Sequence, residues 1–155
     1  WPAIDADYFI DTSIGLTVTG ELTLAPGVTL IFADEQERMD VSGSLNAEGT
    51  ASAPITLTAA NGTAGGWGGL KIYNTSSPNN QLAYVTITYG GGYHNANLRL
   101  DGSSLNPTQV SVSDCTFSYS SGYGVLYVPE YVTITGDLEG NNSYSGNASG
   151  DVGTP

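Results

Sequence analysis

Short segments of alternating apolar and polar residues recur along the whole chain. A first set begins at intervals of 23, 31, 28 and 27 residues and covers residues 16–20, 39–43, 70–74, 98–102 and 125–129. A second set keeps a similar spacing and covers residues 28–30, 55–58, 85–88, 110–113 and 132–135. Such alternation predicts strands with one buried face, because successive side chains of a strand point to opposite sides.

A unit that repeats every roughly 20 to 50 residues is typical of a solenoid, since each unit has an apolar face that only its neighbours can cover. The first four strands close on Gly20, Gly43, Asn74 and Gly102. These residue types accept a positive φ angle more readily than others. We therefore expect the same sharp turn, with positive φ, at one corner of every coil.

Several longer stretches combine the strands with their turns. They are PGVTLIF (26–32), VSGSLNAEGTASAPITLTA (41–59), GGWGGLKI (65–72), LAYVTITYGGG (82–92), ANLRLDG (96–102) and VSVSDCTFSYSSGYGV (110–125). In order and spacing they resemble right-handed parallel β-helix modules of large secreted and cell-surface proteins. The resemblance implies an all-β fold, a right-handed parallel β-helix of about five coils. That architecture serves adhesins, matrix components and polysaccharide-degrading enzymes, so it does not select a function by itself.

The chain divides into three parts around this repeat. Residues 15–136 form the expected β-helix, and residues 1–14 are expected to cap its first coil, as terminal units of solenoids do. Residues 137–155 have little apolar content and are expected to be a polar tail, a linker or a contact segment. If the ends carry assembly contacts, the candidates are Trp1, Tyr8, Phe9, Ile10 and Tyr144.

Charge is sparse and one-sided. Arg38, Lys71 and Arg99 are the only Lys or Arg residues against fifteen carboxylates, which gives a net charge of -12. Nucleic acids and anionic membranes are therefore disfavoured as partners, because both need clustered positive charge. No apolar run is long enough for direct membrane insertion. A Ser-, Thr-, Asn- and Gly-rich surface favours an extracellular or cell-surface location.

Two outward ladders follow from the alignment. Asp40, Lys71 and Arg99 fall at equivalent positions, with Ser42, Tyr73 and Asp101 two residues further along. One interpretation is a polysaccharide lyase in which Arg99 acts as the base. The preferred interpretation is a solvent-exposed row of side chains in which the negative charge of Asp40 offsets the positive charge of Lys71. The second ladder carries hydroxyl groups, and a regular array of that kind can order water as ice does. Its members are Thr29, Thr56/Thr58, Thr86/Thr88, Ser111/Ser113 and Thr133/Thr135, with Ile31 in place of the second Thr of the first strand.

Aromatic residues cluster near the turns. Tyr89, Tyr93 and Tyr123 are candidates for stacking on sugar faces, and tyrosines serve protein interfaces equally well. Trp67 is expected to pack under a loop. His94 has no second His or Cys at ligand spacing, so it is expected at the surface rather than on a metal. Cys115 is the only cysteine and is expected to fill core volume.

Polar loops hold the remaining candidates. No cofactor is predicted; Ca²⁺ is the one ion that acidic loops could bind, through Asp5, Asp7 and Asp11 or through Asp34, Glu35 and Glu37. Glycosylation sequons occur at Asn61, Asn142 and Asn147, and at Asn74, which is the weakest because it is expected to hold a turn.

No catalytic triad, phosphate-binding loop or zinc spacing is present in the sequence. We therefore expect a protein that is not an enzyme: an extracellular structural module of a surface adhesin or matrix assembly. It would associate with itself, as a filament subunit joined through the β-helix ends, or with neighbouring modules of a longer surface protein. A carbohydrate-binding module or polysaccharide lyase-like protein is the alternative, followed by ice binding.

Overall fold

The computed structural model describes residues 1–3 and 6–155, which contain seventeen strands and no helix. Sheet A consists of β1 (Tyr8–Ile10), β4 (Thr29–Phe32), β7 (Ile55–Ala59), β10 (Val85–Thr88), β13 (Thr116–Ser118) and β16 (Ser143–Ser145). Sheet B consists of β2 (Gly15–Val18), β5 (Arg38–Val41), β8 (Leu70–Tyr73), β11 (Ala96–Asp101), β14 (Tyr123–Tyr127) and β17 (Gly150–Gly153). Sheet C consists of β3 (Glu21–Leu24), β6 (Ser44–Glu48), β9 (Gln81–Ala83), β12 (Thr108–Ser113) and β15 (Val132–Thr135).

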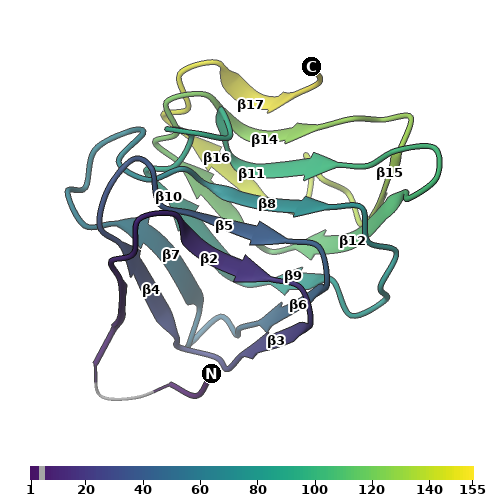
Figure 1. Cartoon of the computed structure of the whole chain (residues 1–155). Helices are drawn as coiled ribbons and strands as arrows, with labels where there is room; N and C mark the ends of the chain where they lie inside the picture. Colours follow the sequence, from purple (N-terminus) through teal and green to yellow (C-terminus); the bar gives the residue numbers. More distant parts are fainter. Residues whose placement is uncertain (4–5) are drawn as a thin grey trace.

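The chain visits sheets B, C and A in turn, and every strand pairs in parallel with the equivalent strand of the next coil. Strands β2 to β16 make five coils, and β1 and β17 extend sheets A and B at opposite ends (Figure 1). The fold is therefore the right-handed parallel β-helix of about five coils that the sequence predicted. None of the described residues forms a helix long and apolar enough to cross a membrane.

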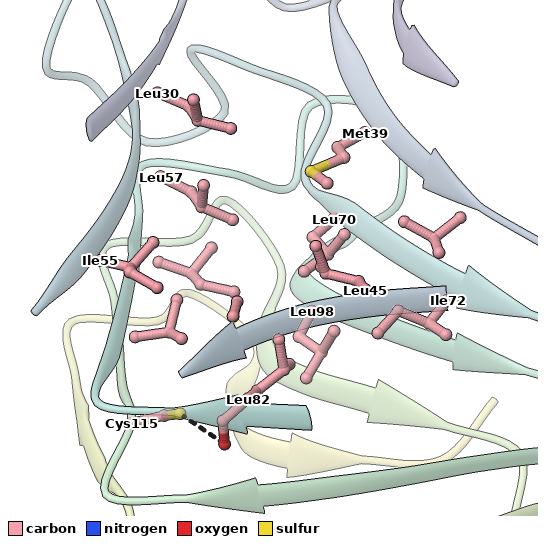
Figure 2. Close-up of a cluster of buried hydrophobic side chains, with 14 of the residues drawn as sticks. Leu30, Met39, Leu45, Ile55, Leu57, Leu70, Ile72, Leu82, Leu98 and Cys115 are labelled. Carbon is pink, nitrogen blue, oxygen red and sulfur yellow. Dashed lines mark hydrogen bonds between the residues drawn. The ribbon is translucent and has the colours of Figure 1, made fainter. Parts of the chain in front are cut away.

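The interior is built from columns of stacked aliphatic residues. Leu30, Leu57 and Ile87 occupy one column of sheet A, and all three are fully buried. Figure 2 shows Leu70, Ile72 and Leu98 of sheet B close to Leu45 and Leu82 of sheet C in the same core. Burying each such side chain contributes about 1.5–3 kcal/mol relative to leaving it exposed, so the stack of coils itself provides the main stabilisation.

The assignment of second strands was wrong in the last two coils. Residues 110–113 and 132–135 belong to β12 and β15 of sheet C, whereas the first three second strands are β4, β7 and β10 of sheet A. The true continuations of sheet A are β13 and β16. Each coil thus has three strands where the sequence repeat suggested two.

The expectation that the residue closing each of these strands has a positive φ was also wrong for the three glycines. Asn74 has a φ of 53°, but Gly20, Gly43 and Gly102 do not adopt positive φ. At Gly43 a Cβ atom would lie 1.9 Å from the carbonyl oxygen of Gly20, and at Gly102 it would lie 2.5 Å from that of Tyr131. Close backbone approach explains these two glycines, because even a methyl group would collide with the neighbouring coil.

The terminal segments take part in the solenoid. Residues 137–155 supply β16 and β17, which pair with β13 and β14. Residues 1–14 supply β1, which pairs with β4 and places the partly buried Tyr8 and Ile10 against the core. The polar tail is thus held by its own chain over these two strands.

Candidate functional site

The outer face of sheet B carries all the positive side chains of the protein. Its register confirms that Asp40, Lys71 and Arg99 are neighbours in one row. The expected pairing of Asp40 with Lys71 is wrong, because Lys71 Nζ lies 2.8 Å from Asp101 Oδ2 and Arg38 Nε lies 2.8 Å from Asp40 Oδ2. Arg99 Nε is 3.0 Å from the same oxygen of Asp101, so Arg99 is engaged by a carboxylate rather than left as a base.

The two aspartates of this face are held as anions. Burial alone would raise the pKa of Asp40, but the contacts with His94 and then Arg38 outweigh it and lower that pKa. At Asp101 the same opposition holds, and the hydrogen bonds from Lys71 and Arg99 lower its pKa. The face therefore carries a network of two charge clusters, one around Asp40 and one around Asp101, in which each carboxylate lies against at least one Lys or Arg side chain.

His94 completes this network, contrary to the expected surface position. Its side chain is buried, with 5% of the residue exposed, and Nε2 lies 2.9 Å from Asp40 Oδ1. The main-chain amide of His94 donates to the carbonyl of Gly68 at 2.8 Å, which anchors the loop that carries it. The sequence carried no signal for this contact, because the distance from His94 to Asp40 depends on how closely the glycine-rich loop folds onto the sheet.

The outer face of sheet A carries hydroxyl groups in two columns. The register corrects the predicted ladder: Ser111 and Thr133 lie in sheet C, and Thr116 and Ser143 take their places. The first column is Thr29, Thr56, Thr86, Thr116 and Ser143, and the second is Ile31, Thr58, Thr88, Ser118 and Ser145. Comparison of residues 116–118 (TFS) and 143–145 (SYS) with residues 56–58 (TLT) and 86–88 (TIT) could have revealed the two missed strands of sheet A.

These columns form a regular and uncharged surface. Neighbouring coils space the hydroxyls ~4.8 Å apart, and two residues along a strand separate the columns by ~6.6 Å. Ser118 and Thr88 are close enough for their hydroxyls to bond, at 3.2 Å. Chemically, this surface can donate and accept hydrogen bonds at repeated positions, while the threonine methyl groups cover the sheet between them.

The three tyrosines proposed for glycan stacking lie in different surroundings. Tyr93 is 57% exposed, and the guanidinium of Arg38 sits 4.2 Å from its ring centre. Tyr89 stacks instead on Tyr119, with ring centres 5.4 Å apart. Tyr123 is half-buried and lies close to the backbone of Gly153. No contact recorded among the described residues joins these three rings, so the glycan strip stays a prediction.

Two of the acidic loop residues accept hydrogen bonds from the main chain. Glu37 is buried, and its carboxylate accepts from the amides of Thr12 and Ala33. Asp34 accepts from the amide of Gln36 at 2.8 Å. Asp5 lies outside the described residues; within them, no group of three or more His, Cys, Asp or Glu side chains is placed to hold a metal ion.

The sequon asparagines differ in how their side chains are used. The amide nitrogen of Asn147 donates to the carbonyl of Phe117 at 3.0 Å, and that of Asn142 donates to Leu138 at 3.0 Å. Both nitrogens would have to leave these bonds to carry a sugar. Asn61 is exposed, and its oxygen accepts from the amide and hydroxyl of Thr63. Asn74 is exposed in its left-handed turn.

The assembly candidates lie at the two ends of the solenoid. The rings of Trp1 and Tyr8 stack with centres 5.0 Å apart, and Phe9 is 58% exposed at the outer side of β1. At the other end Tyr144 stacks on Phe117, with centres 5.5 Å apart. Burial and the nearby carboxylates raise the pKa of Tyr144, so its hydroxyl stays protonated and donates to Leu138.

No pocket is found among the described residues. In comparisons with known proteins, no family model, curated protein or solved structure matches the chain. The candidate surfaces are therefore the charged face of sheet B, the hydroxyl face of sheet A and the two ends.

Proposed function

We propose that the protein is a non-catalytic extracellular structural module that joins other modules, or other copies of itself, through the ends of the β-helix. The observation that carries this proposal is the place of the apolar residues that pack against the core without being fully buried. All but Tyr89 lie in β1 or in the first or last coil, and they are Tyr8, Ile10, Leu16, Leu22, Ala25, Tyr127, Ile134, Leu138 and Tyr144.

The lateral faces support the same proposal by contrast. On sheet B every Lys and Arg is paired with Asp40 or Asp101, and on sheet A the outward positions are mostly hydroxyls. The ends instead offer apolar area together with the unpaired edges of all three sheets, which are natural sites for adding strands. An extracellular setting is proposed from the composition, which is rich in Ser, Thr, Asn and Gly and poor in Lys and Arg.

Sedimentation of the purified chain across a wide concentration range tests this function. We expect association that increases with concentration, with elongated particles in electron microscopy. Dispersed monomers at the highest concentration, in both low and high salt, would count decisively against a module that joins through its ends.

A second candidate function, binding to ice, is favoured by the corrected hydroxyl columns of sheet A. Two columns over five coils, interrupted only by Ile31, lie on one continuous sheet, whereas the predicted ladder combined residues of sheets A and C. We expect thermal hysteresis that Thr86→Tyr reduces, because a ring there would break the array. Thr133→Tyr is the matched control, since Thr133 lies on sheet C. Equal hysteresis in both variants, or none in the parent chain, would exclude this candidate.

A further inference from the structure

Three tyrosines hold a backbone conformation that tyrosine rarely adopts. Tyr84, Tyr89 and Tyr119 have φ angles of 51°, 63° and 53°, in the left-handed region. A bulky side chain is unfavourable there, and such outliers cluster at binding and active sites. The other described non-glycine residues with positive φ are two asparagines and one aspartate, which are types that tolerate it. The tyrosines therefore need a reason beyond the turns they occupy.

All three tyrosines border sheet A. Tyr84 directly precedes β10 and Tyr89 directly follows it, so the two stand at opposite ends of one strand. Tyr119 follows β13 and takes the position of Tyr89 in the next coil, since the register of sheet A aligns β10 with β13. The amides of Tyr89 and Tyr119 make equivalent bonds, to the carbonyls of Ser118 and Ser145. The hydroxyl columns of sheet A thus lie between tyrosines on both sides.

The turns themselves do not need tyrosine. One coil after Tyr119 the same position is held by Gly146, with a φ of 65°. One coil after Tyr84 it is held by Asp114, which follows β12 as Tyr84 follows β9. Stacking explains Tyr89, whose ring centre lies 5.4 Å from that of Tyr119. Among the described residues, however, Tyr84 has no stacked aromatic partner.

Tyr84 and Tyr119 are open to a ligand. They are 37% and 50% exposed. A Cβ atom at Gly146 would lie 2.7 Å from Cδ1 of Tyr119, so the ring keeps its place only because no side chain stands at that position. Within the described part of the chain, the tyrosine hydroxyls that donate to protein atoms are those of Tyr8 and Tyr144. The hydroxyls of Tyr84 and Tyr119 therefore remain available as donors.

From these observations we propose that the outer face of sheet A binds a neutral, unbranched polysaccharide, which lies along β10 and β13 between Tyr84 and Tyr119. Five residues of strand separate the two borders, about 17 Å, a length that several linked sugar rings span. The tyrosine rings contact apolar faces of the sugars, and the threonine hydroxyls between them bond to sugar hydroxyls. These hydroxyls belong to Thr86, Thr88 and Thr116. The proposal goes beyond the proposed function, because it uses a side of the β-helix and not its ends.

Charge selects a neutral ligand. Asp114 is exposed beside Tyr84, and the net charge of the chain is -12, so anionic polysaccharides are repelled. All Lys and Arg residues lie in strands of sheet B. A protein partner fits less well, because the centre of a protein interface is enriched in apolar groups and the centre of this face consists of hydroxyls. Binding to this face should therefore resist salt.

Electrophoresis in native gels that contain a soluble polysaccharide tests the proposal. The parent chain should be retarded by at least one of hydroxyethylcellulose, glucomannan and linear xylan, at low and at moderate salt, and not by polygalacturonate. Tyr84→Asn and Tyr119→Asn keep a residue that tolerates positive φ, so both should be at least as stable as the parent. Each should bind about three- to tenfold more weakly, as expected for one lost ring contact. Tyr131→Asn is the matched control, since Tyr131 is 38% exposed next to β15 of sheet C, and it should bind like the parent.

Several results would overturn this assignment. Retardation by none of the neutral polymers would do so and would leave association through the ends untouched. Retardation by polygalacturonate alone, lost on adding salt, would move the binding site to the charged face of sheet B. Equal retardation of the parent and both folded variants would remove the tyrosines from the site, and a clear loss of stability in Tyr84→Asn would show that they serve the fold. Thermal hysteresis without any retardation would assign the face to ice instead.

Discussion

His94 Nε2 lies 2.9 Å from Asp40 Oδ1, although β8 separates β5, which contains Asp40, from β11, which begins just after His94. The contact ties the loop before β11 to a coil that is not its neighbour. Arg38, from the same strand, donates to the other oxygen of Asp40, so one carboxylate holds two side chains and joins two segments of the chain. One row further, Asp101 does the same for Lys71 and Arg99.

Acid should weaken the fold through these two aspartates. Their pKa values in the folded protein lie below the ordinary value of 3.8, so the unfolded chain binds protons more readily near that pH. The stabilisation is fully present above about pH 3.8 and is lost as the pH falls through the lower folded pKa. Urea unfolding measured at steps between pH 7 and pH 2.5 should show the free energy of unfolding fall over that window.

The variants Asp40→Asn and Asp101→Asn provide the control for this prediction. Each variant removes a carboxyl group whose pKa is lowered in the folded protein. Each should therefore be less stable than the parent protein at neutral pH and should lose less free energy of unfolding below pH 4. Identical pH slopes in parent and variants would mean that other carboxylates govern the acid sensitivity.

Two glycines of consecutive coils should respond in opposite ways to alanine. Gly43→Ala directs a methyl group into the carbonyl of Gly20 at 1.9 Å and should destabilise the protein by about 1–3 kcal/mol. Gly20 has open space around its Cβ position and no positive φ, so Gly20→Ala should be neutral or stabilising by up to ~1 kcal/mol. Thermal melts of the two variants side by side give the comparison; equal destabilisation would contradict the packing at this corner.

Trp67 should be the most sensitive aromatic position. It is fully buried, its ring stacks on Phe32 with centres 4.2 Å apart, and Nε1 donates to the carbonyl of Thr88 at 2.9 Å. Trp67→Ala should cost about 3–5 kcal/mol through the cavity it leaves. Trp67→Phe keeps part of the stack but leaves the carbonyl unbonded, at a cost of about 1–3 kcal/mol. Denaturant unfolding ranks the two, with Trp1→Phe as the control at a half-exposed ring.

The repeat of sheet B and of β4, β7 and β10 in sheet A was readable from the sequence because most of their inward residues are long aliphatics that alternate with polar ones. Met39, Leu70 and Leu98 illustrate this, since they are stacked partners in the predicted row. Sheet C was missed in the first three coils. The residue before β9, for example, is the buried Asn80, whose side chain accepts from the amide of Leu45 and donates to the carbonyl of Gln109. An asparagine that bonds main chains of adjacent coils has no hydrophobic periodicity to reveal it.

The strands of the last two coils were assigned to the wrong sheet because their spacing and alternation resemble those of sheet A. Val110-Ser-Val-Ser and Val132-Thr-Ile-Thr have the same alternation as the strands of sheet A, and alternation does not tell one sheet of a solenoid from another. The length of the connecting turn determines which sheet follows. The turn between β12 and β13 has only two residues, Asp114 and Cys115, so the strand of sheet A comes directly after β12. The network around His94 was out of reach as well, because it joins residues whose distance depends on how a glycine-rich loop folds back.

Cys115 should be almost inert in the folded protein. Burial raises its pKa to about 11, and its Sγ donates to the carbonyls of Ser113 and of Leu82, the second of which Figure 2 shows. Since the thiolate is the reactive form and the side chain is 1% exposed, iodoacetamide at pH 8 should modify the native protein far more slowly than the urea-unfolded chain. Mass spectrometry of the modified fraction over time measures both rates. Labelling of the native protein as fast as that of the unfolded chain would show that the turn between β12 and β13 opens readily.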